Sequence, residues 1–254
     1  MIVWREKFVA TGVHFLVTLT LTACAAAIVF LVWFPDPFQT MIGGTELFLL
    51  VVGCDLVLGP LVSLVIYNSR KSRRALVIDY AIVGIVQIVA MVYGVYILAG
   101  TRPVYVVFDK DRLEIVIARD LSETELAAAR DPNHQSLPVT GPRFVGIKIP
   151  DAERNAALFE AVMAGKESHI RPRFYVPYDS VLPQIRARAK PLADLEQRLP
   201  KSKPLLDAAV GKISIPPERV KWLPVRHRRG FWTALIDTDD GRPVAYVDFD
   251  PYGA

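Results

Sequence analysis

The stretch Leu47–Tyr67, LFLLVVGCDLVLGPLVSLVIY, decides the fold of this chain. Its 21 residues are apolar or small apart from Asp55, Ser63 and Tyr67. As an α-helix the stretch would be about 31 Å long, close to the hydrocarbon thickness of a bilayer. A charge near the middle of such a span costs roughly 2.5–3.5 kcal/mol, so Asp55 should face protein and not lipid. The sequence therefore predicts a membrane-spanning helix with a sheltered acidic group.

Two further apolar runs flank this helix, Thr11–Phe34 and Leu76–Ala99. The segment Leu21-Thr22-Ala23-Cys24 matches a lipoprotein cleavage box, but apolar residues continue past it to Phe34. A signal peptide has a shorter apolar core, which favours an uncleaved helix. Short loops between the runs indicate a three-helix transmembrane bundle. We expect a membrane domain of residues 1–100, with spans at about 11–34, 47–67 and 76–99.

The distribution of basic residues orients these spans. Arg5 and Lys7 precede the first run, and Arg70, Lys71, Arg73 and Arg74 separate the second from the third, whereas the loop Pro35–Glu46 has no Lys or Arg. Basic residues concentrate on the cytoplasmic side of a membrane. We therefore expect a multi-pass protein of the bacterial inner membrane, with a cytoplasmic amino terminus and a periplasmic domain of residues 101–254.

Depth along the helices suggests partners for the buried polar groups. At 1.5 Å per residue, Asp55 and Gln87 lie about 18 Å and about 16 Å from the cytoplasmic end. We expect a hydrogen bond between their side chains, which would fix register more than it adds stability. Asp79 is only about 5 Å deep and is predicted to be an interfacial carboxylate. Its candidate partners are His14, Arg73 and Arg74.

Residues 101–254 have the pattern of an α+β domain, a small antiparallel sheet with helices on one side. Apolar runs separated by short polar turns predict the hairpins 104–108 with 113–118 and 220–226 with 231–237. Thr238–Gly241 predicts a tight two-residue turn. The other expected elements are strands at 144–149 and 242–249, an extended segment at 171–178, and four helical segments. These are 122–130 with a cap at Ser122, 151–164 capped by Asp151 and ended by Gly165, 179–199 broken near Pro183 and Pro191, and 205–210.

Composition excludes several classes of protein. The chain has 254 residues, 52% of them hydrophobic, and a mean hydropathy of +0.30, which is too apolar for a wholly soluble protein. The net charge of +4 comes from basic residues interleaved with acidic ones, so no basic stripe for nucleic acid forms. The cysteines, Cys24 and Cys54, lie in apolar runs and offer neither a disulfide framework nor metal spacing.

No catalytic constellation is visible. An aspartyl protease needs two adjacent carboxylates, but the predicted depths place Asp55 and Asp79 about 13 Å apart. No nucleophile elbow, phosphate loop or zinc motif occurs. His134, His169 and His227 lie in polar segments and are expected at the surface. We therefore predict no enzyme activity, no cofactor and no metal.

Aromatic residues beside basic ones are the candidate interface of the outer domain. Tyr, Trp and Arg anchor many protein interfaces, although the same aromatic residues could instead fill the core. The candidate periplasmic interface residues are Arg102, Arg112, Tyr175, Trp222 and Trp232.

Several motifs resemble the TfpX/TfpZ family of type IV pilin accessory proteins. The resemblance is most specific in the first 112 residues and weaker beyond them. It rests on Trp33-Phe34-Pro35, Gly43-Gly44, Asp55-Leu56-Val57-Leu58-Gly59-Pro60-Leu61, Asp79, Gln87, Tyr93-Gly94, the segment 102–108 (RPVYVVF), Asp111-Arg112, and the later YVPY, Pro191-Leu192 and WLPV segments.

The resemblance implies an inner-membrane protein that helps a cognate type IV major pilin accumulate and assemble, by binding and not by catalysis. It brings no known catalytic site or cofactor. We expect the bundle to hold the single helix of a pilin at an intramembrane polar site of Asp55, Gly59, Pro60, Asp79, Gln87 and His14. Small residues (Gly53, Gly59, Ala81 and Gly84) would allow close approach, and a Gly59-Pro60 kink would open a groove. The alternatives are a membrane-anchored periplasmic sensor and an enzyme that modifies the envelope.

Overall fold

The computed structural model describes residues 4–66 and 71–253, and the chain divides into two compact units, Met1–Thr101 and Arg102–Ala254. We call them the helical unit and the sheet unit. The predicted end of the second span at Tyr67 lies outside the described residues. So do Arg70 and the side chains of Arg5 and Lys7, on which the predicted orientation depends.

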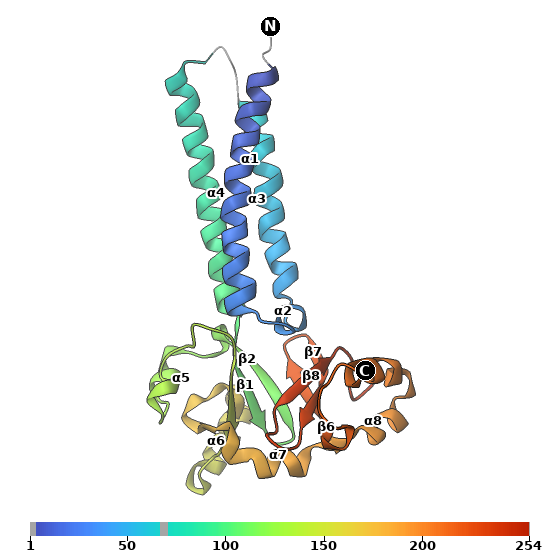
Figure 1. The fold of residues 1–254 in the computed structure, drawn as a ribbon. Coiled ribbons are helices and arrows are strands. Elements are labelled where there is room, and N and C mark those ends of the chain that lie inside the picture. The colour runs from blue at the N-terminus through green and yellow to red at the C-terminus, as the bar shows by residue number, and fades with distance from the viewer. Residues whose placement is uncertain (1–3, 67–70, 254) are drawn as a thin grey trace. The chain divides into compact units, whose positions relative to one another are not determined.

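Three long helices make up most of the helical unit (Figure 1). The helix α3 (Gly44–Ile66) packs against both α1 (Trp4–Ala27) and α4 (Arg73–Thr101). Pro35 follows the first helical run, as its missing N–H and fixed ring require, and Phe34 closes a buried cluster with Val29, Phe48 and Leu98. The bounds are α1 Trp4–Ala27, continued by a π-helix Ile28–Trp33, then α2 Phe38–Met41, α3 Gly44–Ile66 and α4 Arg73–Thr101.

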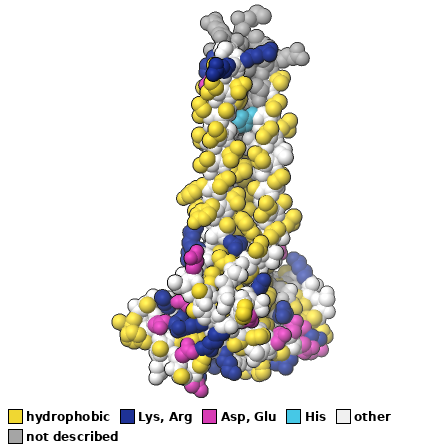
Figure 2. All heavy atoms as spheres, turned by 90° about the vertical axis from the view of Figure 1, so that its left-hand side faces the viewer, with side chains coloured by type: hydrophobic (Ala, Val, Ile, Leu, Met, Phe, Trp, Pro, Cys, Tyr) yellow, Lys and Arg dark blue, Asp and Glu magenta, His cyan; other side chains and the backbone are white. Residues whose placement is uncertain are grey.

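The outer surface of these helices is apolar over most of the face seen in Figure 2. Side chains such as Leu31, Val65 and Val77 are at least two-thirds exposed. Among the described residues, two helical segments are long and apolar enough to cross a membrane, Thr11–Trp33 and Arg73–Thr101. An exposed apolar surface of this extent is typical of a surface that contacts a protein partner or lipid.

The sheet unit is an eight-stranded mixed sheet with the order β4-β3-β1-β2-β6-β7-β8, in which β5 also pairs with β6. The strands are β1 Pro103–Asp109, β2 Arg112–Ile117, β3 Arg143–Ile147, β4 Tyr175–Pro177, β5 Lys190–Pro191, β6 Val220–His227, β7 Gly230–Asp237 and β8 Pro243–Val247. The α-helices are α5 Glu123–Ala127, α6 Arg154–Ala164, α7 Leu182–Arg188, α8 Leu192–Arg198 and α9 Lys203–Val210.

The prediction of an antiparallel sheet is wrong in two places. The predicted hairpins β1–β2 and β6–β7 are confirmed, but β1 pairs with β3 and β2 pairs with β6 in parallel. Parallel neighbours need a long crossover, so these contacts join segments that are distant in the sequence. Two apolar runs around a short polar turn indicate a hairpin, but such a local pattern carries no signal for the pairing of distant strands.

Smaller differences concern turns and caps. Asp151 begins a 3-10 turn before α6 and does not cap the helix with its side chain. The connection from β7 to β8 is wider than a two-residue turn, because the Gly241 N–H donates to the Asp237 carbonyl at 2.8 Å. The segment 171–178 is extended only at β4 and forms 3-10 turns on both sides. The predicted Ser122 cap of α5 and the Gly165 end of α6 are confirmed.

Two buried clusters form the core of the sheet unit. One gathers Tyr105, Val116 and Tyr175, and the other gathers Leu195, Trp222 and Leu235. The two halves of the sheet meet where β2 and β6 pair over a short stretch, in which Glu114 lies opposite Arg226. There the guanidinium of Arg226 also binds Glu167, so that one cation neutralises two carboxylates where the two halves of the sheet meet.

Candidate functional site

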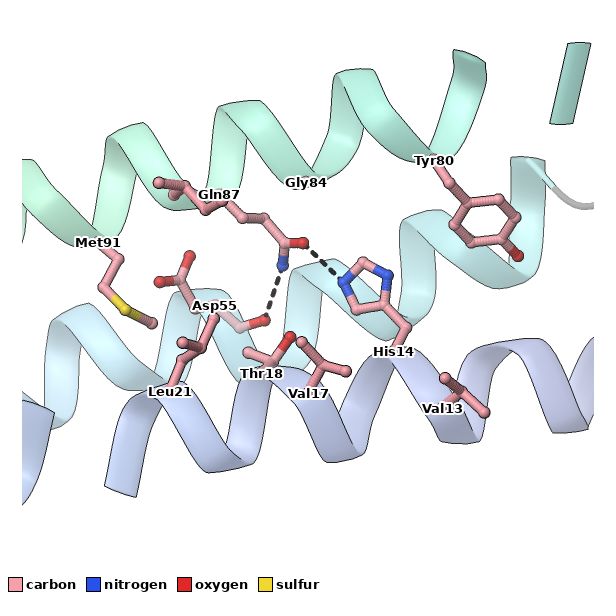
Figure 3. A pocket seen from close by; sticks show the side chains of 11 residues that line it. Val13, His14, Val17, Thr18, Leu21, Asp55, Tyr80, Gly84, Gln87 and Met91 are labelled. Atoms are coloured by element: carbon pink, nitrogen blue, oxygen red, sulfur yellow. Dashed lines mark hydrogen bonds between the residues drawn. The ribbon is translucent and has the colours of Figure 1, made fainter. Parts of the chain in front are cut away.

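Side chains from the three long helices converge on one groove in the helical unit (Figure 3). Its residues on α4 recur every three or four positions, from Tyr80 through Gly84 and Gln87 to Met91, and therefore share one helix face. Among the α3 side chains that the structure describes, that of Asp55 reaches the groove. The groove has a volume of about 470 Å³ and is lined by Val13, His14, Val17, Thr18, Leu21, Asp55, Tyr80, Gly84, Gln87, Ile88 and Met91.

One amide connects the three helices in this groove. The Oε1 of Gln87 lies 2.6 Å from the Nε2 of His14, and the Nε2 of Gln87 donates to the main-chain oxygen of Asp55 at 3.4 Å (Figure 3). A main-chain oxygen can only accept, so the amide nitrogen faces it and Oε1 accepts from the Nε2–H of His14. Gln87 thus fixes the register of α4 against both neighbours.

Asp55 and Gln87 do lie at the same depth and contact each other, as predicted, but the predicted hydrogen bond between their side chains is not formed. Gln87 binds the main chain of Asp55 and not its carboxylate. The Asp55 side chain is nevertheless buried, with 6% of the residue exposed. Its Oδ2 is completely buried and has no hydrogen-bond partner among the side chains that the structure describes. The carboxyl therefore lies in the groove without the donor that a buried acceptor requires.

Gly59 is the small residue that allows this arrangement. A Cβ at Gly59 would lie 2.0 Å from Gln87 Nε2 and 3.2 Å from His14 Nε2. Gly53 and Gly84, which were also expected to permit close helix approach, have nothing within 4 Å of a Cβ, whereas Gly94 packs against Val51. The side chain of Pro60 lies outside the described part of the chain, and α3 remains one helix from Gly44 to Ile66.

We expect Gly59→Ala to displace the Gln87 amide. The new methyl group would force Gln87 away from the Asp55 carbonyl, at a cost of about 1–3 kcal/mol for the buried groups left unpaired. The displacement can be measured in purified protein that carries one introduced cysteine on α3 and one on α4. The disulfide between them should form more slowly in Gly59→Ala than in the protein with Gly59. Gly53→Ala is the matched control, since its Cβ meets open space. Equal rates in both variants would show that Gly59 is not needed for this contact.

Asp79 was expected to pair with His14, Arg73 or Arg74, and this is wrong. It binds Lys71 at 2.5 Å, while His14 binds Gln87. Arg73 and Arg74 precede Asp79 by six and five residues, a spacing that does not bring side chains together on a helix face. Asp79 therefore forms an ion pair at the end of α4 and stands outside the groove lining.

The candidate interface residues of the sheet unit fall into two groups. Tyr175 and Trp222 are core residues, 5% and 0% exposed, so the prediction that their side chains form an interface is wrong. Each ring belongs to one of the two buried clusters of the sheet unit. Arg102, Arg112 and Trp232 are half-buried; Arg102 donates to the Pro138 carbonyl at 3.1 Å, and Arg112 binds Asp111 at 2.9 Å.

The histidines of the sheet unit are not surface residues, contrary to expectation. His134 and His227 are 8% and 9% exposed, and the side chain of His169 is 14% exposed. Burial disfavours the charged ring and lowers the pKa of all three, that of His169 to about 4. Burial raises the pKa of Glu114 to about 7, although Arg226 opposes the shift. Within the described residues, no group of three His, Cys, Asp or Glu side chains is placed to hold a metal ion.

The lowered pKa of His169 predicts that the stability difference between the wild type and His169→Gln depends on pH. Its pKa in the folded protein lies below the unfolded value of 6.5, so its contribution is present above pH 6.5 and is lost as the pH falls towards 4. Between pH 7 and 4 the wild type should lose up to about 3 kcal/mol relative to His169→Gln. Pulse proteolysis of the full-length protein in detergent, detected at the carboxyl terminus, measures this difference. The subtraction cancels the opposite contribution of Glu114, and a difference independent of pH would contradict the prediction.

Two features of the structure were missed from the sequence. The first is the groove face of α1 and α4. Thr18 and Met91 lie four residues after His14 and Gln87, and Tyr80 lies seven residues before Gln87, a helical spacing that could have revealed this face. The second is the outer face of α6. Its apolar side chains are 64–74% exposed, and their spacing in pairs four residues apart was the available signal. These residues are Leu158, Phe159, Val162 and Met163.

The fold and the site define a protein of two units. The first is a set of helices with an apolar exterior and a groove that contains buried polar side chains, and the second is an α+β unit with a mixed sheet. Residues 2–43 match the family model described as fimbrial assembly protein FimB. The fimbrial assembly proteins of serogroups I and E1 of Dichelobacter nodosus are 32% and 31% identical over 245 residues, which is 95% of this chain and 95% of each relative. That of serogroups C1 and C2 is 37% identical over 119 residues, 47% of this chain and 91% of the relative.

The chain therefore belongs to the fimbrial assembly protein family. No solved structure matches it. The family assignment is consistent with the resemblance to pilin accessory proteins, and it associates the chain with fimbrial assembly.

Proposed function

We propose that this protein is an inner-membrane accessory protein of the TfpX/TfpZ type, which binds a cognate type IV major pilin before assembly and acts by binding and not by catalysis. The observation that carries the proposal is the groove between α1 and α4. Its apolar walls include Val13, Val17 and Ile88, each more than half exposed, while Asp55 is buried at its floor. A groove of this kind suits a helix with an apolar surface.

The helical unit supplies the membrane anchor in this proposal. α1, α3 and α4 cross the inner membrane, and α4 leads into β1 with only Arg102 between Thr101 and Pro103. The sheet unit then lies on the periplasmic side, where it contacts the globular part of the pilin. Half-buried Arg102, Arg112 and Trp232 and the exposed face of α6 are the surfaces available for that contact.

Deletion of the gene tests the function itself. The pilin pool of whole cells and the pilin sheared from the cell surface should both fall, and the wild-type gene should restore both. A normal pilin pool together with normal fimbriation in the deletion strain would contradict the proposal.

Single cysteines test the topology. In a background with Cys24 and Cys54 replaced by alanine, Ser214→Cys should react with a membrane-impermeant maleimide in intact spheroplasts, because Ser214 is an exposed residue of the sheet unit. Ser72→Cys, exposed at the start of α4, is the matched control and should react only after lysis. The reverse pattern would show that the membrane orientation is wrong.

A further inference from the structure

We propose that the Asp55 carboxyl accepts a hydrogen bond from a donor on the membrane helix of the client pilin. The groove would then recognise a single polar residue on an otherwise apolar helix. This inference rests on the proposed function and specifies the chemistry of the client. Its starting point is the buried Oδ2 of Asp55, which has no hydrogen-bond partner among the described side chains. A donor from outside the chain would remove the cost of that unpaired acceptor.

The neighbouring polar groups cannot supply the donor in this arrangement. The Gln87 amide nitrogen is directed to the main-chain oxygen of Asp55, and its Oε1 accepts from His14. Turning the amide toward the carboxyl would break both contacts. The hydroxyl of Thr18, which also lines the groove, makes no hydrogen bond to the Asp55 Oδ2. Leu21, Ile88 and Met91, also in the lining, carry no side-chain donor. The groove therefore presents an acceptor oxygen that none of the described groove side chains satisfies.

Depth favours a helix over a lipid headgroup as the occupant. Asp55 is 11 residues from each end of α3, Gly44 and Ile66, which places it about 16 Å from either end of the helix. A lipid ammonium group stays near the membrane surface, whereas a spanning helix carries side chains at every depth. The groove is open at its walls, because Val13, Val17 and Leu21 are 44–57% exposed, so that a helix can approach from the lipid side.

The complementary group on the client is an ammonium, a guanidinium or an amide N–H near the middle of its span. A carboxylate acceptor pairs most strongly with a charged donor and less strongly with a neutral one. A carboxylate on the client would face Asp55 with like charge and should be rejected. The predicted order of preference at the central position is thus lysine, then glutamine, then leucine and glutamate.

Synthetic membrane helices test this preference directly. Four leucine–alanine peptides of equal length would carry lysine, glutamine, leucine or glutamate at the centre, and the full-length protein in nanodiscs would carry a diazirine amino acid at Gly84. This position lines the groove and a Cβ there meets nothing within 4 Å. The lysine helix should be cross-linked about tenfold more than the leucine helix, a difference of ~1.4 kcal/mol. The same diazirine at Gly53, outside the groove lining, should show no preference.

Variants of Asp55 complete the test. Asp55→Asn keeps the shape but removes the negative charge, and Asp55→Leu removes the acceptor, so both should reduce the preference for lysine to near unity. Equal labelling of the lysine and leucine helices in the wild type, or preferential labelling of the glutamate helix, would overturn the inference. If pilin in cells still cross-links to the diazirine at position 84 but the wild-type groove shows no preference for the lysine helix, the proposed hydrogen bond to Asp55 is contradicted. The proposed function would then still hold. Absence of pilin cross-linking would count against the proposed function itself.

Discussion

Asp55→Leu should leave the protein at normal levels and reduce the cellular pilin pool about tenfold, together with the surface fimbriae. The carboxyl is buried, and its Oδ2 has no hydrogen-bond partner among the residues that the structure describes. Leucine removes a group that costs roughly 2.5–3.5 kcal/mol at the centre of a membrane helix, so the variant should fold at least as well. A polar residue that costs stability without a partner in its own chain is typical of a functional site.

Immunoblots of this protein and of the pilin, with surface pilin measured after shearing, read out both parts of the prediction. Asp55→Asn separates charge from shape, and Thr20→Val is the control, because Thr20 is exposed on α1 and bonds its own helix at Leu16. Normal pilin and normal fimbriae in Asp55→Leu would show that Asp55 is dispensable. Loss of this protein itself would instead show that Asp55 has a structural role.

Trp222→Ala should destabilise the sheet unit by about 3–5 kcal/mol, which is the usual cost of removing a large buried ring. The ring is completely buried, its Nε1 donates to the Pro191 carbonyl at 3.1 Å, and the cations of Lys190 and Arg198 lie 5.1 and 5.4 Å from the ring centroid. Alanine would remove the centre of one buried cluster and leave the Pro191 carbonyl unpaired.

The same pulse-proteolysis measurement on the full-length protein gives the size of the loss. Trp232→Ala is the control, because Trp232 is half-buried and contacts His227 with ring centroids 6.3 Å apart. It should cost only about 1 kcal/mol, as ordinary substitutions do. Equal costs for the two variants, or a loss of pilin binding by stable Trp222→Ala, would restore the view of Trp222 as an interface residue.

Local patterns predicted the local parts of the fold. The hairpins β1–β2 and β6–β7 follow from apolar runs on either side of short polar turns. The end of α6 follows from Gly165, which adopts a left-handed conformation with φ of 64°. Helix geometry also placed Asp55 and Gln87 at one level, because depth depends only on a fixed rise per residue. These features are decided by residues close to one another in the chain.

Features that depend on distant segments were not predicted. The parallel pairing of β2 with β6 brings Glu114 to Arg226, 112 residues away, and no local pattern reports it. The burial of His227 depends on the strands around it, although its polar sequence neighbours suggested the surface. The partner of Gln87 was misassigned because depth fixes the level of a side chain and not its direction around the helix.

The most direct test of the central claim is photo-cross-linking in living cells between the groove and the pilin. A diazirine amino acid at Gly84 should form an adduct with pilin, and the same residue at Gly53 should not, since only Gly84 lines the groove. Mapping the adduct to the apolar helix of the pilin would support the account. Pilin adducts of equal yield at both positions, or none at Gly84 while the pilin pool is normal, would contradict it.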